Sequence, residues 1–213
     1  MQHKICPNNR HFALILAAGK STRMGICKTT LLWHNNQTLL RYQAEEFLLA
    51  GITPIIVLGS HNAHRKIDCP NGSLIAINYH CDNPSGTLPK RGKTESILTG
   101  LELLPNDFST ITISAVDQPR SCSVYQTLLQ AYLQNNSAIV APCYRQKLGH
   151  PLLFSARLLP ELKNINESTF GLRRIVRDFY SNIEKIEFAS SEVMIDFNYF
   201  KEYQKFKNTA VYL

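Results

Sequence analysis

Short apolar runs alternate with segments of helical spacing along most of this 213-residue sequence. The apolar runs end at glycine, proline or aspartate, which mark turns between elements. This alternation is typical of β-α units, in which strands pair in parallel and helices cover both faces of the sheet. We expect strands at 11–16, 54–58, 74–79, 110–116, 138–141, 152–154, 183–188 and 193–195, and helices at 38–50, 94–104, 124–133, 170–180 and 199–206. The pattern therefore predicts an α/β domain of three layers with a mainly parallel sheet.

Length and composition favour a single domain over residues 1–213. With 44% hydrophobic residues, the chain can bury one sizeable core but is short for two independent ones. Neither an internal repeat nor a low-complexity linker divides the sequence. The polar residues 1–10 are expected to form a flexible N-terminal extension.

The same sequence indicates the compartment. Its apolar stretches stay below the ~18 residues of a membrane span, and residues 1–10 lack the apolar run of a signal peptide. Its six cysteines are far apart and form no CxxC pair, which favours a reducing environment. We therefore expect a cytoplasmic protein with no membrane partner.

The chain is basic, with 23 basic and 16 acidic residues and a formal net charge of +7. Such an excess suits nucleic acid, an anionic membrane surface or a phosphorylated small molecule, and charge does not choose among them. The densest basic stretch, at 90–93, and the arginines at 173–177 lack the interleaved aromatic residues of a single-strand binder. Nucleic acid is therefore not an expected partner.

The segment that follows the first expected strand combines small residues with cations. It reads Leu16, Ala17, Ala18, Gly19, Lys20, Ser21, Thr22, Arg23, Met24, Gly25, Ile26, Cys27 and Lys28. Small side chains let backbone N–H groups converge on phosphate oxygens, while Arg23 offers a planar fork and Lys28 a compact charge. Neither the Walker A loop nor the dinucleotide GxGxxG fingerprint is present. The segment predicts a triphosphate site, and the alternative is a glycine-containing turn with solvated basic residues.

A carboxylate, Asp117, closes the fourth expected strand and is followed by Gln118 and Pro119. Mg²⁺ takes oxygen ligands, usually one or two carboxylates together with substrate phosphates. Ligands in parallel sheets bind beyond the carboxyl ends of the strands, where Asp117 would face segment 16–28. Asp117 is therefore a candidate metal ligand, and its alternative role is to initiate an Asp-x-Pro turn.

Taken together, these residues resemble a known family. LAAGKSTRMG at 16–25, followed by Lys28, is similar to the LAAGxSxRMGxxKxLL signature of the MobA-like nucleotidyltransferases, with Cys27 where the family commonly has proline. DQP at 117–119 resembles the family's metal-binding DMP or DQP motif. GHPLLF at 149–154 resembles the GHPVLF of its molybdenum cofactor cytidylyltransferase branch. The resemblance implies the Rossmann-like nucleotidyltransferase fold, with three layers and a mainly parallel sheet.

The resemblance also implies roles for single residues. Arg23, Lys28 and Asp117 would form the catalytic set. Asp117 and Asp196 would hold the metal, although the family's Thr-Pro-Glu-Asp after the second aspartate is replaced at 197–200. The residues implied for nucleotide binding are Leu16, Ala17, Ala18, Gly19, Ser21, Arg23, Lys28 and Ser96.

For function, the resemblance implies transfer of CMP from CTP to the phosphate of a molybdopterin-type cofactor, with release of pyrophosphate. Mg²⁺ would be the cofactor, with Mn²⁺ as the alternative ion, and a recipient molybdoenzyme would be a partner. His150 and Arg173 would bind the acceptor. A phosphate nucleophile is already ionised near pH 7 and needs no base, so His150 would position the acceptor and not remove a proton from it.

Other functions stay open at this point. A guanylyltransferase shares the fold but tends to read LAGG where this chain has 16–19. Sugar-phosphate or methylerythritol-phosphate nucleotidyltransferases differ in the acceptor. A non-catalytic chaperone could bind the cofactor for a molybdoenzyme, whereas an oxidoreductase on a dinucleotide fold is disfavoured because its glycine fingerprint is missing.

Overall fold

The computed structural model describes residues 10–79 and 92–209. Residues 1–9 of the expected N-terminal extension lie outside this part, and so do the basic residues Lys90 and Arg91. The strands are β1 (His11–Leu16), β2 (Thr53–Gly59), β3 (Leu74–Asn78), β4 (Thr110–Ala115), β5 (Ile139–Tyr144), β6 (Lys147–Leu148), β7 (Leu152–Ser155) and β8 (Ile183–Glu187). The helices are α1 (Leu39–Leu49), α2 (Lys93–Leu101), α3 (Cys122–Asn135), α4 (Leu159–Lys163), α5 (Leu172–Asp178) and α6 (Phe200–Thr209).

These strands form one mainly parallel sheet in the order β3-β2-β1-β4-β7-β5-β6, with β8 pairing alongside β5. β1 pairs in parallel with β2 on one side and with β4 on the other. β7 runs antiparallel between β4 and β5. Since the chain moves outward from β1 to β2 and β3 and then returns to β4, the sheet has a topological switch point between β1 and β4, where ligands of such folds bind.

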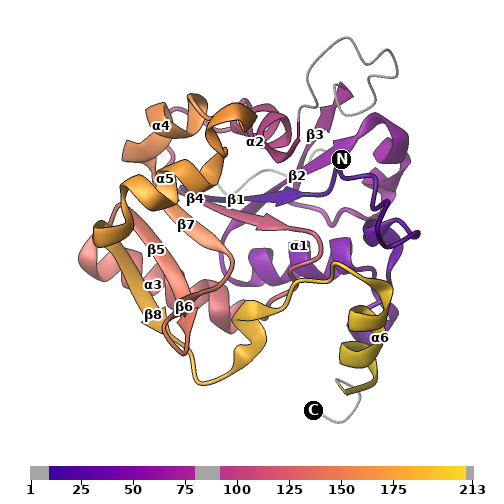
Figure 1. Ribbon diagram of the computed structural model, residues 1–213. Helices are drawn as coiled ribbons and strands as arrows, with labels where there is room; N and C mark the ends of the chain where they lie inside the picture. Colours follow the sequence, from indigo (N-terminus) through magenta and orange to yellow (C-terminus); the bar gives the residue numbers. More distant parts are fainter. Residues whose placement is uncertain (1–9, 80–91, 210–213) are drawn as a thin grey trace.

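Helices cover both faces of the sheet (Figure 1): α1 and α3 lie on one face, and α2, α4 and α5 on the other. The alternation within β1 matches these layers, because Phe12 and Leu14 join the core on the α2 side while Ala13 and Ile15 join the core on the α1 side. A Cβ on Gly100 would lie 2.6 Å from the Leu14 side chain, so glycine is needed for α2 to approach β1. The α/β three-layer fold predicted from the sequence is confirmed.

Two element predictions need correction. The expected strand at 193–195 is wrong, because Ser191–Met194 forms a 3-10 turn whose start is capped by the Ser190 hydroxyl. The carbonyls of this segment bind an arginine side chain and a loop N–H instead of a neighbouring strand. The helix expected at 170–180 is shorter, because Phe170 and Gly171 have positive φ and α5 begins only after them.

Among the described residues, no helix is both long enough and apolar enough to cross a membrane. Within the same part of the chain, Cys27, Cys69, Cys122 and Cys143 are free thiols.

Candidate active site

The loop after β1 is closed by its own backbone. The Ser21 carbonyl accepts hydrogen bonds from the N–H groups of Met24 at 3.0 Å and Gly25 at 3.1 Å, and the Ser21 hydroxyl accepts one from the Lys28 N–H at 3.1 Å. Ser21 and Gly25 both have positive φ, which gives the loop its tight curvature. The loop is therefore shaped before any ligand binds.

A buried amide that sequence reasoning missed ties this loop to the sheet. The Asn62 side chain donates to the Ala17 carbonyl at 2.9 Å and accepts from the Gly59 N–H at 2.8 Å. Asn62 is 2% exposed, so these bonds are shielded from water. Its sequence signal is an amide side chain three positions after Gly59, the glycine that ends the second strand.

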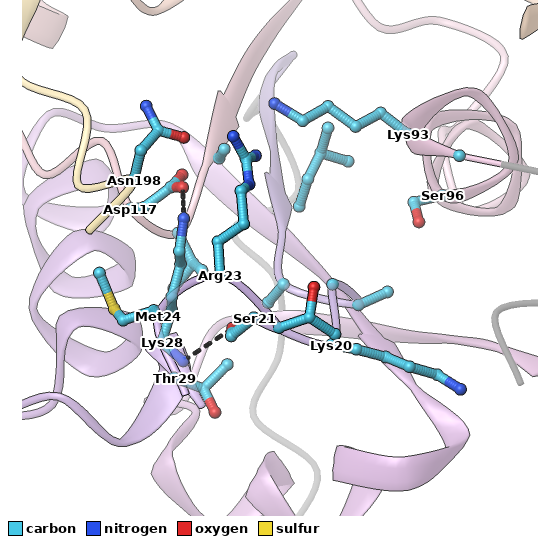
Figure 2. A pocket seen from close by; sticks show the side chains of 18 residues that line it. Lys20, Ser21, Arg23, Met24, Lys28, Thr29, Lys93, Ser96, Asp117 and Asn198 are labelled. Carbon is cyan, nitrogen blue, oxygen red and sulfur yellow. Dashed lines mark hydrogen bonds and ion pairs between the residues drawn. The ribbon is translucent and has the colours of Figure 1, made fainter. Parts of the chain in front are cut away.

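The loop borders a cavity of about 360 Å³, which we term the first cavity. Figure 2 shows its wall, with Lys28 pointing at Asp117 across the gap and Arg23 beside them. The lining residues with a predicted role are Leu16, Ala17, Ala18, Gly19, Ser21, Arg23, Lys28, Ser96 and Asp117, and Lys20, Thr22, Met24, Thr29, Gly92, Lys93, Ala115, Val116 and Asn198 complete it. The structure thus brings together the nucleotide and catalytic residues implied by the resemblance.

Lys28 and Asp117 form an ion pair beyond the carboxyl ends of β1 and β4, and their side chains are 14% and 12% exposed. Asp117 is fixed on its backbone side, because its carbonyl accepts from the Phe197 N–H at 3.1 Å. The turn behind it is held by Gln43, whose amide donates to the carbonyls of Ala115 and Gln118. The loop at 16–28, which we term the cradle loop, and the Asp117 carboxylate therefore face one another on the same edge of the sheet.

Ser96 also lines the first cavity, but its hydroxyl accepts a hydrogen bond from the Asn78 amide at 3.1 Å and is buried. Its side chain thus helps hold α2 against β3. A contact from Ser96 to a ligand would need the hydroxyl to share this bond.

A second cavity of about 910 Å³ adjoins the first. It is lined by residues distant in sequence, among them Gln118 after β4, Leu148, Gly149 and His150, the helix α5, and Asp196. Both residues implied for acceptor binding, His150 and Arg173, lie here. Among the described residues, four line both cavities: Leu16, Arg23, Lys93 and Ala115.

Arg120, which the sequence analysis did not single out, holds the second cavity together. Its side chain is 1% exposed and donates to the carbonyls of Pro119 at 2.7 Å, His150 at 2.9 Å, Val193 at 3.0 Å and Ile195 at 2.7 Å. Burial lowers the pKa of Arg120 to about 10. Its sequence signal was its place directly after the DQP motif.

His150 lines the second cavity and is, as a whole residue, partly open to solvent. Desolvation by the surrounding protein, followed by the positive charges of Arg120 and Lys93, lowers the pKa of His150 to about 4. Its imidazole is therefore neutral at pH 7, with one nitrogen able to donate and the other to accept. This suits positioning of a ligand and not neutralisation of its charge.

Asp196 and Asp117 supply carboxylate oxygens, the kind of ligand that a divalent cation takes. The Oδ1 atom of Asp196 is buried without a hydrogen-bond partner. Partial burial and the neighbouring negative charge of Asp117 raise the pKa of Asp196. An orphaned carboxylate oxygen beside a second carboxylate is a donor set that Mg²⁺ or Mn²⁺ accepts. Within the described residues, no group of three or more His, Cys, Asp or Glu side chains could hold a metal, so further ligands would come from substrate or water.

Comparison with known proteins agrees with this geometry. The sequence profile of the MobA-like NTP transferase domain matches residues 13–185. Among curated protein sequences, none matches this chain significantly.

Several solved structures share the fold. Rv0371c from Mycobacterium tuberculosis has a TM-score of 0.76 at 19% identity, with 94% of this chain and 98% of that chain covered. A nucleotidyl transferase from Methanothermobacter, Mth528, has a TM-score of 0.74 at 18% identity, covering 95% of this chain and 98% of that one. The 4-diphosphocytidyl-2C-methyl-D-erythritol synthase of Anaerococcus prevotii has a TM-score of 0.67 at 13% identity, covering 94% and 96%. A complex of Rv0371c with manganese has a TM-score of 0.71 at 18% identity, covering 94% and 99%.

Proposed function

The chain belongs to the MobA-like NTP transferase family, and from this premise we propose that it transfers CMP from CTP to the phosphate of a molybdopterin-type cofactor, releasing pyrophosphate. The observation that carries the proposal is the ion pair between Lys28, at the end of the loop after β1, and Asp117, after β4. A cation and a metal-ligating carboxylate within one small cavity are the two charges that a metal-bound triphosphate needs.

In this proposal the first cavity binds the nucleotide. The loop at 16–21 offers backbone N–H groups to the triphosphate, Arg23 binds its oxygens with a planar fork, and Lys28 leaves Asp117 to bind the same anion. Because the acceptor phosphate and the triphosphate are both anionic, catalysis consists mostly of positioning and of charge neutralisation. No general base is required, in accord with the neutral His150.

Asp117 and Asp196 would hold a divalent ion at the boundary of the two cavities. The bound ion would neutralise charge on the triphosphate oxygens. Support comes from the orphaned Asp196 oxygen and from the related fold of Rv0371c, which has been solved with manganese. Mg²⁺ is proposed as the physiological ion and Mn²⁺ as its substitute.

The choice of CTP and of a pterin acceptor rests on sequence and on the second cavity. Gly149 and His150 of the GHP motif line a cavity larger than the first, and Arg173 lies on its wall to meet an anionic group. A cytidyl group also appears in the name of the Anaerococcus prevotii synthase. A recipient molybdoenzyme would then be the partner that takes the product.

The experiment is a calorimetric comparison of Mg·CTP, Mg·GTP and Mg·ATP binding, followed by pyrophosphate release with CTP and the phosphorylated pterin. We expect CTP to bind most tightly and turnover to require both substrates. In Asp117→Ala, turnover should fall by about 10²–10³, whereas the exposed Asp107→Ala should behave as the wild type. A preference for GTP, or pyrophosphate release unchanged in Asp117→Ala, would contradict the proposal.

A further inference from the structure

Lys93 is the first residue of α2 and lines both cavities. Figure 2 shows its side chain extending from the start of α2 into the first cavity, toward Arg23. The lysine lies outside the loop at 16–28 and follows a glycine at the helix start; the sequence analysis placed it in the densest basic stretch, 90–93, and gave a nucleotide-binding role in this helix to Ser96. Its position raises the question of what a cation does at this place.

The two cavities share a boundary, formed by the residues that line both. Of the four residues that line both, Leu16 and Ala115 are apolar ends of β1 and β4, while Arg23 and Lys93 are cations from opposite sides. If a nucleotide occupies one cavity and an acceptor the other, the bond that forms must cross this boundary. The two phosphates that react therefore approach each other between Arg23 and Lys93.

Within the part of the chain that the structure describes, Lys93 is held in no ion pair, whereas the Lys28 ammonium is held by Asp117. Lys93 is exposed, so its ammonium can turn toward an anion in either cavity. The positive charge of Lys93 also acts on His150 in the second cavity, because it contributes to lowering the pKa of that residue. The cation is thus available at the boundary.

The start of α2 is anchored, which fixes the root of this side chain. The Glu167 carboxylate accepts a hydrogen bond from the Thr94 N–H at 2.9 Å, a favourable place for negative charge at a helix N-terminus. A Cβ on Gly92 would lie 2.6 Å from a Glu167 oxygen, so glycine permits this close packing. Glu167 therefore clamps the backbone on either side of Lys93.

We propose that Lys93 is a further catalytic residue, whose ammonium contacts the acceptor phosphate and the α-phosphate together as they approach. It neutralises the repulsion between the two anions, while Arg23 acts from the other side of the boundary. In the step, an acceptor phosphate oxygen forms a bond to the α-phosphorus and the bond to the pyrophosphate oxygen breaks. Lys93 keeps its proton throughout. This role rests on the proposed nucleotidyl transfer.

The test compares Lys93→Met, which removes the charge at similar length, with Lys93→Arg, which keeps it. Lys66→Met is the matched control, because Lys66 is exposed and lines neither cavity. Three quantities are measured: the Kd of Mg·CTP, the binding of inorganic phosphate to protein saturated with a non-hydrolysable CTP analogue, and kcat for pyrophosphate release. Melting temperatures verify that each variant is folded.

In Lys93→Met we expect kcat to fall by about 10²–10³ and phosphate affinity to fall by roughly tenfold or more, with the Kd of Mg·CTP nearly unchanged. Lys93→Arg should recover most of both losses. Wild-type phosphate affinity in Lys93→Met, absence of phosphate binding in the wild type, or a kcat equal to that of Lys66→Met would overturn the role of Lys93. If the wild-type protein binds no nucleotide, the proposed function is wrong. This outcome is distinct from failure of the Lys93 role, because it is seen in the wild type without any variant.

Discussion

The two cavities differ in how they are built. The first is formed largely by one continuous stretch, 16–24, folded back on itself by hydrogen bonds to Ser21 and tied to β2 through Asn62. The second is assembled from Leu16, Arg23 and the start of α2 together with segments between β4 and Asp196, and the buried Arg120 joins three of those later segments. The loop residues at 17–22 line the first cavity and not the second, whereas part of the second cavity depends on a single side chain that binds several segments.

This difference also separates their chemistry. The first cavity carries the paired charges Lys28 and Asp117, so changes there should affect ligand binding and rate. The second cavity is also lined by charged side chains, among them Arg173 and Asp196, but the segments behind it are held by backbone carbonyls that bind the buried Arg120, so changes at Arg120 should first affect folding stability. Variants in each region can therefore be told apart by which quantity they change.

The largest effect is expected from Lys28→Met. Loss of the ammonium should lower turnover with Mg·CTP by about 10²–10³. The same change frees the Asp117 carboxylate, so Mn²⁺ affinity without nucleotide should rise by roughly tenfold, the equivalent of one hydrogen bond between charged groups. Manganese binding is measured by electron paramagnetic resonance and turnover by pyrophosphate release.

Lys163→Met is the control for Lys28→Met, because Lys163 is exposed at the end of α4 and outside both cavities. It should change neither quantity. Manganese affinity that falls in Lys28→Met would show that Lys28 does not compete for Asp117, and the paired charges would then not describe the first cavity.

Arg120→Met should destabilise the fold by about 2–4 kcal/mol, because carbonyls from three segments lose their donor and the smaller side chain leaves unfilled space. Urea denaturation measures this loss. Arg157→Met, at an exposed arginine that also donates to a carbonyl, should cost less than about 1 kcal/mol. If the two variants are equally stable, Arg120 does not hold the second cavity together. In folded Arg120→Met, Mg·CTP affinity should stay near wild type.

A pair of glycine variants sharpens the comparison further. In Gly149→Ala the new Cβ would lie 2.5 Å from the Val193 carbonyl oxygen, so the backbone must shift, at a cost of about 1–3 kcal/mol. In Gly19→Ala nothing lies within 4 Å of the new Cβ, so stability should stay within about 0.5 kcal/mol. Melting temperatures of the two proteins would test this, and equal losses would contradict the different construction of the cavities.

The smallest effect concerns pH. Because the folded pKa of His150 lies near 4, below its ordinary value of 6.5, the neutral ring contributes stability above pH 6.5, and this is lost as pH falls toward 4. The loss should stay below about 1 kcal/mol, because His150 is partly open to solvent, which weakens the charge effects on it. His150→Gln should lack this part of the pH dependence. An NMR titration that places the His150 pKa at 6.5 or above would remove the predicted effect.

Sequence reasoning reached the first cavity almost completely. The residues at 16–28 are neighbours in the chain, and Asp117 was expected beyond the carboxyl end of a parallel strand; the structure pairs that strand, β4, with β1 and so brings both to one edge. It reached His150 and Arg173 only by resemblance. It misjudged 193–195 as a strand, because Val193 packs into the core beside α3 while the carbonyls of the segment bind Arg120 and not a neighbouring strand.

By itself the sequence determined the layered α/β fold, the cradle after β1 and the carboxylate opposite it, because these depend on local spacing and on the edge shared by parallel strand ends. Only the tertiary structure decided the second cavity, the tethers from Arg120 and Asn62, and the place of Lys93 between two cavities. Those contacts join residues far apart in the chain, and their partners are mostly backbone carbonyls and N–H groups. Every residue has such groups, so no pattern of side chains marks them in advance.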